Sequence, residues 1–438
     1  MKNTPIDSNK VEIAIKELNI PDLSNATIRE IVKITNTIEA ATHKKFIRME
    51  MGVPGLTPPE IGTQAEIEAL KKGVASDYPM LDGIKPLKEE TSKFIKNFMN
   101  IDVSPTGCVP TVGAMQGGYA AFMLVSNLDP KKDTALFIDP GFSVQKTQFQ
   151  VIGHKYTNFD VYNYRGNKLR DKLEEIVSKG NINSIIYSNP NNPSWICFTE
   201  EELKIIGDIA NKHDIVILED LAYFGMDFRT DLSQPGVAPY QPTVANYTNN
   251  YILLISSSKA FSYAGQRLGM LCMSNTLFAR DYPNLKQRFG VATLGYVIIQ
   301  RLIYALSSGV CHSSQYALAA MFKAANQGKF NFIKDVREYG EKAAIMKRIF
   351  TENGFKIVYD KDIDKNLADG FYFTISYPGM EGGELMEKLL YYGISAISLK
   401  SCGSEHTEGL RACVSQVKRK QFSDLESRVK QFNNDFSV

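Results

Sequence analysis

From Ser104 onward, short apolar segments alternate with longer segments whose apolar residues recur at helical spacing. The apolar segments predict four buried strands: 135–138, 184–187, 215–218 and 251–255. The helical segments between them include 114–127, 169–178 and 200–213. Apolar strands that alternate with helices predict an α/β fold, in which helices cover both faces of a mostly parallel sheet.

The regions on either side of this alternation predict a second, smaller lobe. Before it lie a helical segment at 22–51, a Gly- and Pro-rich loop at 52–59 and an amphipathic helix at 61–72. After it, one long helical segment covers 315–353, and strands of an α+β lobe are predicted at 355–358, 371–375 and 410–414. A chain of 438 residues exceeds one ordinary domain. We expect an N-terminal arm with part of the small domain at 1–75, a large domain at 76–325 and the C-terminal small domain at 326–438.

The most informative residues follow the predicted strands. Asp139, Asn189, Asp220 and Lys259 each lie at or just beyond the carboxyl end of an apolar segment. In open parallel sheets, ligands bind beyond these ends. Lys259 follows the segment 251–255, where a charged amine is costly to bury. The pattern therefore predicts one ligand site that the four strand ends share.

Composition and charge exclude several classes of function. A net charge of +2 provides no basic surface for nucleic acid or an acidic membrane. The six cysteines form no C-x-x-C pair, which argues against a zinc site or a disulfide framework, so we expect no metal site. The N-terminus lacks the apolar segment of a signal peptide, and 291–310 contains Gln300 and Arg301, which favours a buried helix over a membrane span. We expect a cytoplasmic protein.

Three motifs follow one another along the chain. They are Asn-Pro-Asn-Asn-Pro at 189–193, Leu-Glu-Asp-Leu-Ala-Tyr at 218–223 and Ser-Ser-Ser-Lys-Ala-Phe at 256–261, with Gly-Gln-Arg-Leu-Gly at 265–269. In that order they resemble the signature of the class I/II aminotransferases, a family of fold-type I pyridoxal phosphate (PLP) enzymes. The resemblance runs from about Gly52 to Arg411. It implies a large PLP-binding domain with a seven-stranded type of sheet, and a smaller α+β domain.

The resemblance implies three catalytic residues: Lys259, Asp220 and Tyr223. Lys259 would form the Schiff base with PLP and then move the substrate's α-proton as general base and acid. Asp220 would keep the pyridine nitrogen protonated, through an ion pair of about 4 kcal/mol before desolvation. Tyr223, together with Asn192, would hydrogen-bond to the phenolic oxygen of the cofactor.

The resemblance also implies the groups that hold the phosphate, the ring and the substrate. The phosphate would be bound by Gly113, Ala114, Met115, Ser256, Ser258 and Arg267. Phe142 would stack on the pyridine ring, and Tyr78 would reach the phosphate in a partner subunit, which makes a homodimer the expected assembly. The substrate carboxylate would be bound by Gly52, Asn192 and Arg411.

Each of these residues also has a purely structural interpretation. Lys259 could be a lysine that extends from a strand end toward solvent, Asp220 could be a helix N-cap, and Asn192 could belong to an ordinary turn. Tyr223 could be a packed aromatic residue, and Arg411 one partner of a surface ion pair. The spacing of the motifs favours the functional interpretation of the set.

The chain departs from the family pattern at Trp195. Relatives carry Thr-Gly after the second Asn-Pro, where this chain has Ser194 and Trp195. Because a tryptophan lacks the freedom of glycine to adopt a positive φ, we expect this loop to have a different shape. Trp195 then packs in the interior, which is the favoured interpretation, or narrows the pocket. We find no second arginine placed for a side-chain carboxylate, which argues against a dicarboxylate substrate.

These observations predict a PLP-dependent aminotransferase that moves an amino group between an L-amino acid and a 2-oxo acid. Two alternatives use the same cofactor site: β-elimination by a C–S lyase, and decarboxylation of an amino acid. A PLP-sensing transcription regulator is disfavoured, because the roughly fifty residues before Gly52 are too few for a winged-helix domain. Nucleic acid and membranes are not expected partners.

Overall fold

A seven-stranded sheet forms the centre of the larger lobe. The computed structural model describes residues 4–20 and 22–437. The strand order is β2-β8-β7-β6-β5-β3-β4. The strands are β2 (Cys108–Val112), β3 (Thr134–Asp139), β4 (Lys155–Asp160), β5 (Ile182–Ser188), β6 (Val216–Leu221), β7 (Tyr251–Ser256) and β8 (Leu268–Met273). β8 runs antiparallel to both of its neighbours, whereas the other pairs are parallel, so the predicted mostly parallel sheet is confirmed.

Helices cover both faces of this sheet, as the apolar strands require. Along β7, Ile252 and Leu254 pack with α5 on one face, whereas Leu253 and Ile255 join the core on the other. The helices of this lobe are α3 (Glu60–Lys71), α4 (Lys85–Met99), α5 (Gly113–Val125), α6 (Ser143–Ile152), α7 (Lys168–Val177), α8 (Glu200–His213), α9 (Asn275–Ala279), α10 (Pro283–Phe289), α11 (Leu294–Val297), α12 (Tyr304–Ser307) and α13 (His312–Asn326). A π-helix at Ile298–Ile303 joins α11 to α12, so this segment is a largely buried helix.

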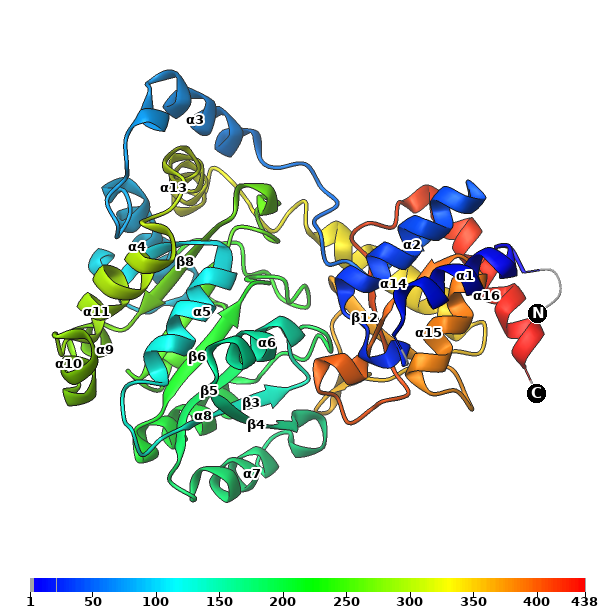
Figure 1. The fold of residues 1–438 in the computed structure, drawn as a ribbon. Helices are drawn as coiled ribbons and strands as arrows, with labels where there is room; N and C mark the ends of the chain where they lie inside the picture. Colours follow the sequence, from blue (N-terminus) through cyan, green and yellow to red (C-terminus); the bar gives the residue numbers. More distant parts are fainter. Residues whose placement is uncertain (1–3, 21, 438) are drawn as a thin grey trace.

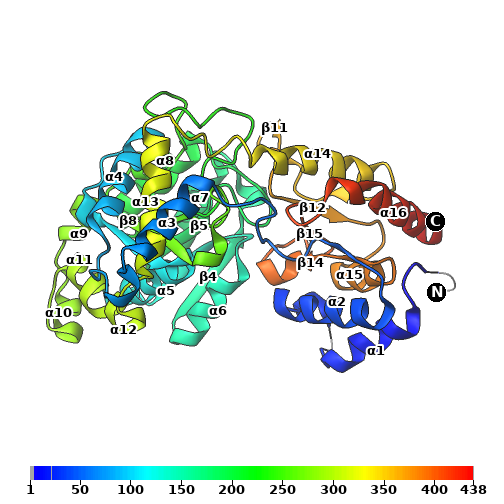
Figure 2. The same ribbon diagram turned by 90° about the horizontal axis from the view of Figure 1, so that it is seen from above.

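The smaller lobe combines residues 337–437 with residues 4–20 and 22–50 (Figures 1 and 2). Its sheet has the order β14-β15-β12-β9. The strands are β9 (Lys356–Ile357), β12 (Tyr372–Ser376), β14 (Ile397–Ser398) and β15 (Leu410–Cys413), with a hairpin of β10 (Lys361–Asp362) and β11 (Lys365–Asn366). The helices are α1 (Ser8–Leu18), α2 (Ile28–Thr42), α14 (Arg337–Thr351), α15 (Gly382–Tyr391) and α16 (Phe422–Phe436). β1 (Ile47–Arg48) pairs in parallel with β13 (Ile394–Ser395), which ties the N-terminal segment to this lobe.

Two predicted helical segments were too long. The segment 315–353 is not one helix, because α13 ends at Asn326 and α14 begins at Arg337. Gly328 has a φ of +66° there, and the side chain of Asn331 accepts hydrogen bonds from the next turn. The two helices then belong to different lobes (Figure 1). Within 22–51 the only α-helix among the described residues is α2, which starts after the capping box of Thr27 and ends at Thr42, where the C-cap His43 has a φ of +56°. A short 3₁₀ helix at Leu23–Asn25 precedes it.

No helix in the part of the chain that the structure describes is long and apolar enough to cross a membrane.

A cluster of phenylalanine rings connects five segments of the chain: α4, the segments after β6 and β7, α13, and the segment between α13 and α14. Phe94 of α4 is completely buried, and its ring contacts five others: Phe98, Phe224, Phe261, Phe322 and Phe332. The centroids of Phe94 and Phe322 are 4.4 Å apart in a stacked arrangement. Phe261 lies two residues after Lys259, so this cluster supports the segment that carries the lysine.

We expect Phe94→Ala to lower the free energy of unfolding by about 3–5 kcal/mol, because it leaves a cavity among five rings. Urea unfolding followed by circular dichroism and by the fluorescence of Trp195, the only tryptophan, measures this loss. Val151→Ala removes an apolar side chain that is 70% exposed and should change stability by less than about 0.5 kcal/mol. Equal unfolding midpoints for the two variants would contradict the assigned role of the cluster.

Candidate active site

The carboxyl ends of β5, β6 and β7 meet at one edge of the sheet. Ser188 of β5 lies opposite Asp220 of β6, which in turn lies opposite Leu254 of β7. The backbone N–H of Asn189 donates to the carbonyl of Asp220 at 3.0 Å. Lys259 follows β7 by three residues, so the parallel register brings its side chain to the same edge. The predicted convergence of strand ends therefore exists in the structure.

The amine of Lys259 is held in a poorly solvated position. Its Nζ donates to the carbonyl of Gly52, from the 52–59 loop, and lies 5.5 Å from the centroid of the Phe371 ring. Burial lowers the pKa of Lys259 to about 8, and Arg267 and Arg411 act in the same direction. An appreciable fraction of this amine is therefore neutral near pH 7, and a neutral amine is the nucleophilic form.

Asp220 is a buried carboxylate with two hydrogen-bond donors. The N–H of Ala222 donates to Oδ1 at 3.0 Å, and Nε2 of Gln145 donates to Oδ2 at 2.9 Å. Burial raises the pKa of Asp220 to about 6, while these donors and Lys259 hold it down. Gln145 was not predicted from the sequence; its position in the first turn of α6, three residues after Phe142, is the signal that could have identified it.

Arg411 reaches the site from the smaller lobe. Its side chain is almost fully buried on β15, its Nη1 donates to Oδ1 of Asn192 at 3.4 Å, and its Nη2 donates to the carbonyl of Glu50. Nε is buried and has no hydrogen-bond partner among the described residues. Arg411 is thus no surface ion-pair residue, because no carboxylate of the described chain lies within ion-pair distance of it. The spare donor suits an added anionic group such as a carboxylate.

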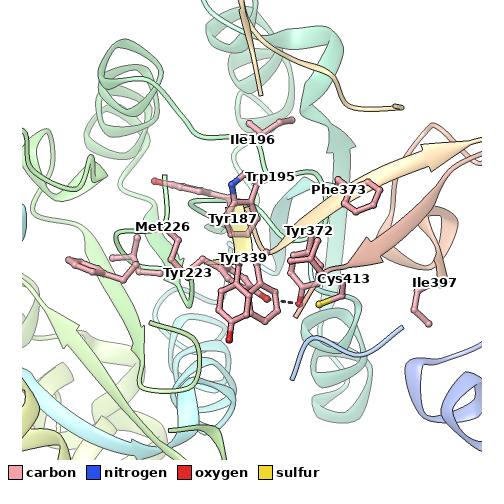
Figure 3. Packing of buried hydrophobic residues seen from close by; sticks show 14 of the residues in the cluster. Tyr187, Trp195, Ile196, Tyr223, Met226, Tyr339, Tyr372, Phe373, Ile397 and Cys413 are labelled. Carbon is pink, nitrogen blue, oxygen red and sulfur yellow. Dashed lines mark hydrogen bonds between the residues drawn. The ribbon is translucent and has the colours of Figure 1, made fainter. Parts of the chain in front are cut away.

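Tyr223 is buried, and its hydroxyl is 2.7 Å from the hydroxyl of Tyr372 on β12 (Figure 3). Tyr223 was predicted at this site from the sequence, whereas Tyr372 was not, because a tyrosine in an apolar strand carries no local signal of its role.

A set of hydrogen-bond donors surrounds the N-terminus of α5. Gly113 has a φ of +66°, and a Cβ atom there would lie 2.5 Å from Nη2 of Arg267. A Cβ on Gly269 would lie 2.7 Å from the backbone N of Ala114, so backbone and guanidinium approach closely only because both residues are glycine. The first backbone N–H groups of α5, those of Ala114 and Met115 among them, have no intrahelical acceptor. Together with Arg267 they form an arrangement that attracts an oxyanion.

Four further predicted residues differ in how close they lie to this cluster. Ser256 is the last residue of β7 and Ser258 follows the strand; both are buried, and the Ser258 N–H donates to Oγ of Ser256 at 3.1 Å. Phe142 is partly buried at the N-cap of α6, in the same short turn as Asp139. Tyr78 is 90% exposed in the loop before α4, and the structure does not bring it to the other site residues of its own chain.

Trp195 contradicts the expectation that the 194–195 loop has a different backbone. Its φ is +67°, the left-handed conformation that glycine adopts readily. The indole is 1% exposed and packs edge-on against Tyr223 and Tyr372, with centroids 5.3 and 6.2 Å away. A Cβ on Gly370 would lie 1.9 Å from the indole, so that glycine makes room for it. Burial of the large ring offsets the strained backbone, and the favoured interpretation of Trp195 as a packed residue is confirmed.

Comparisons with known proteins agree with this geometry. A family model described as aminotransferase class I and II matches residues 44–428. An aspartate aminotransferase of Pyrococcus horikoshii is 29% identical over 251 residues, which cover 57% of this chain and 60% of that protein. An aromatic-amino-acid aminotransferase of Thermococcus litoralis is 29% identical over 254 residues, or 56% of this chain and 59% of that protein. The chain thus spans about 60% of the length of the curated relatives it matches.

Solved structures match over a longer range. The aspartate aminotransferase of Thermotoga maritima superimposes with a TM-score of 0.75 at 17% identity, over 96% of this chain and 99% of that one. An aminotransferase of Mycobacterium tuberculosis gives a TM-score of 0.76 at 16% identity, over 95% of this chain and 98% of that one. At these identities the likeness shows a shared fold.

The strain at Trp195 can be measured with two truncations. Glycine is normally less stabilising than alanine, but at a φ of +67° alanine is strained. We expect Trp195→Gly to be more stable than Trp195→Ala by about 1 kcal/mol, with both less stable than the wild type. The same pair at Ser178, whose φ is −59°, should show the opposite order in urea unfolding. An alanine variant as stable as the glycine variant at position 195 would refute the strain.

The lowered pKa of Lys259 predicts that the stability of the protein depends on pH. Between pH 8 and 10.5 the unfolded chain holds this proton and the folded protein does not, so stability rises with pH across that window. We expect Lys259→Met to be more stable than the wild type at about pH 7, and this advantage to shrink by on the order of 2 kcal/mol by about pH 10.

Urea unfolding at several pH values measures that difference. Lys85→Met removes a lysine whose side chain is 85% exposed and should show no such trend. A gap between Lys259→Met and wild type that stays constant with pH would show that the amine is not destabilised by burial.

Proposed function

The chain belongs to the aminotransferase class I and II family, and from that premise we propose that it is a PLP-dependent aminotransferase acting on an L-amino acid and a 2-oxo acid. The observation that supports this most is the position of the Lys259 amine, with Asp220 and two arginines, Arg267 and Arg411, acting on its pKa. An amine with a lowered pKa, an acid and two separate anion-binding groups form the set that this reaction requires.

The residues at this edge of the sheet fit PLP. Arg267, the hydroxyl of Ser258 and the N-terminal amides of α5 suit a phosphate, and the contacts of Gly113 and Gly269 leave no room there for side chains. Asp220 suits a protonated pyridine nitrogen. Burial disfavours the carboxylate form of Asp220, and a positive charge next to it would stabilise that form. Phe142 suits the face of the ring. We propose that these residues, with Ser256, Asn192 and Tyr223, hold the cofactor.

Bound PLP supplies an electron sink for the bond that breaks at the substrate's α-carbon. The chain's own residues orient the substrate and move the proton. Arg411 binds the substrate carboxylate, and its unpaired Nε is a donor available for that contact. Lys259 accepts the substrate's α-proton on Nζ and later gives it up again. Its pKa of about 8 suits both the acceptance and the release of a proton near neutral pH. The carbonyl of Gly52 accepts a hydrogen bond from this amine and so orients it.

We further propose a homodimer in which each subunit completes the other's site. Tyr78 and Met80 are 90% and 72% exposed, and Tyr296 and Tyr304 are 44% and 56% exposed. Large apolar side chains on the surface of one lobe favour burial against a second copy. Tyr78 would then contact the phosphate in the partner subunit. We also propose that the chain divides into an N-terminal arm with part of the small domain at 1–75, a large domain at 76–325 and a C-terminal small domain at 326–438. The six cysteines are free, which suits the reducing conditions of the cytoplasm, and we propose that location for the protein.

Reduction of the purified, PLP-loaded protein with borohydride tests the attachment site. We expect peptide mass spectrometry to find a pyridoxyl group on Lys259, and Lys259→Met to lose both this group and the absorbance band of the cofactor. Turnover should fall by about 10²–10⁴-fold or more. Lys342→Met is a matched control, because Lys342 is also a buried lysine with a pKa of about 8, yet it donates to the carbonyl of Ser415 in the smaller lobe.

A panel of amino acids then identifies the reaction. Pyridoxamine phosphate and a 2-oxo acid support amino-group transfer. Ammonia with pyruvate would indicate β-elimination instead, and carbon dioxide with an amine would indicate decarboxylation. A protein that binds no PLP when the cofactor is added in excess would overturn the proposed function.

A further inference from the structure

A cavity of about 570 Å³ lies in the smaller lobe, away from the candidate active site. It is formed by the C-terminal end of α2, the segment that leads from α2 into β1, and the first turns of α16. Its volume is within the range of sites that bind small molecules. None of the residues that line it belongs to the candidate active site.

Positive charge dominates the lining of this cavity. Two of the ten lining residues, Glu39 and Asp424, are acidic, whereas six are cationic. The cationic residues are Lys44, Lys45, Arg48, Lys418, Lys420 and Arg428. A concave surface with an excess of one charge concentrates ions of the opposite charge. The lining therefore favours an anionic ligand.

The two carboxylates hold the sides of the cavity together. Glu39 accepts a hydrogen bond from the N–H of Phe46 at 2.8 Å and lies 3.3 Å from Nζ of Lys45. Asp424 pairs with Arg428 at 2.9 Å, and Arg428 also donates to the carbonyl of Lys45 at 3.0 Å. These contacts connect α16 to the segment before β1. Both acidic charges are thus balanced by neighbours, and the shape of the cavity is fixed by the chain itself.

The lysines on the α16 side of the cavity remain available to a ligand. Lys418, Arg419 and Lys420 form the longest run of consecutive basic residues in the chain. Arg419 pairs with Glu338 and Glu341 at 2.6 and 2.5 Å, whereas Lys418 and Lys420 line the cavity and are exposed. Within the described part of the chain, neither of these two lysines forms an ion pair. Their charges are therefore not compensated by the protein.

The opposite side of the cavity contributes a third such lysine. Nζ of Lys44 donates to the carbonyl of Pro5 at 2.6 Å, and no carboxylate of residues 4–20 and 22–437 lies within ion-pair distance of it. Uncompensated lysines on two sides of one cavity repel each other, and a ligand with several anionic groups removes that repulsion from both sides at once. Lysine and arginine are also the residues that bind phosphate groups most often.

We propose that this cavity binds a small polyanion that carries two or more phosphate groups. A long polyanion such as a nucleic acid is disfavoured, because the net charge of the chain is only +2 and provides no extended basic surface beyond the cavity. The site is separate from the proposed PLP site, since no residue is common to both.

Titration calorimetry of the PLP-loaded protein with inorganic tripolyphosphate, in a buffer without phosphate, tests the proposal. PLP occupies the phosphate-binding groups of the active site, so binding that remains belongs elsewhere. We expect one site per chain, with an affinity that falls as the salt concentration rises. Orthophosphate should bind at least about tenfold more weakly, because it cannot contact both sides of the cavity.

The double variant Lys418→Glu/Lys420→Glu should weaken tripolyphosphate binding by about tenfold or more. Both lysines are exposed and outside any ion pair of the described chain, so the fold should be retained. Lys204→Glu/Lys430→Glu is the matched control, because it changes the net charge equally at exposed positions of α8 and α16 that do not line the cavity. This control should bind tripolyphosphate as the wild type does.

Three results would overturn the proposal: no binding of tripolyphosphate to the wild type, an unchanged affinity in the Lys418→Glu/Lys420→Glu variant, or an equal loss of affinity in the control. Tighter binding of a single-stranded oligonucleotide than of tripolyphosphate would also overturn it, in favour of a macromolecular partner. The proposed aminotransferase activity is unaffected by each of these results, because none of the four lysines belongs to the PLP site.

Discussion

Burial of the Lys259 amine disfavours its charged form, and the other charged groups of the site adjust how strongly its pKa is lowered. Two arginines, Arg267 and Arg411, act on it in the same direction as burial, whereas Asp220 acts against it. The result is an amine that is partly neutral near pH 7 instead of fully protonated. Among the described residues, only the carbonyl of Gly52 accepts a hydrogen bond from it and no carboxylate pairs with it, so the amine is oriented without being neutralised.

The site also requires that polar side chains of the two lobes meet at the junction between the lobes. Arg411 and Tyr372 come from adjacent strands of the smaller lobe, and their partners Asn192 and Tyr223 come from loops of the larger one. Buried polar contacts hold this junction together elsewhere: Arg165 pairs with Asp362 of the β10–β11 hairpin at 2.7 Å. Because breaking such a pair leaves a buried charge unpaired, the lobes have a strong preference for one relative position.

At Trp195, packing at the junction of the lobes overrides the usual backbone preference of the residue. Left-handed backbone is costly for a large side chain, yet the indole fills the space between Tyr223, Tyr372 and Gly370. The chain accepts strain at one residue because the packing of a large buried ring offsets it. The bulk of this side chain also limits the movement of the Tyr372 ring.

Local patterns in the sequence were sufficient to predict the family and four of the seven strands of the larger lobe, β3, β5, β6 and β7. These central strands are apolar along their length and the motifs lie at their carboxyl ends, whereas β2, β4 and β8 were not predicted. They did not predict the break between α13 and α14, because the helical spacing of apolar residues extends on both sides of the point where the chain passes from one lobe to the other. Gln145, Tyr372 and the backbone of Trp195 were missed for a common reason: each is defined by a partner far away in the sequence. The sequence by itself determined which groups stand at the strand ends, since strand periodicity is local. Only the tertiary structure decided what those groups touch, since burial, pKa and hydrogen-bond partners depend on both lobes together.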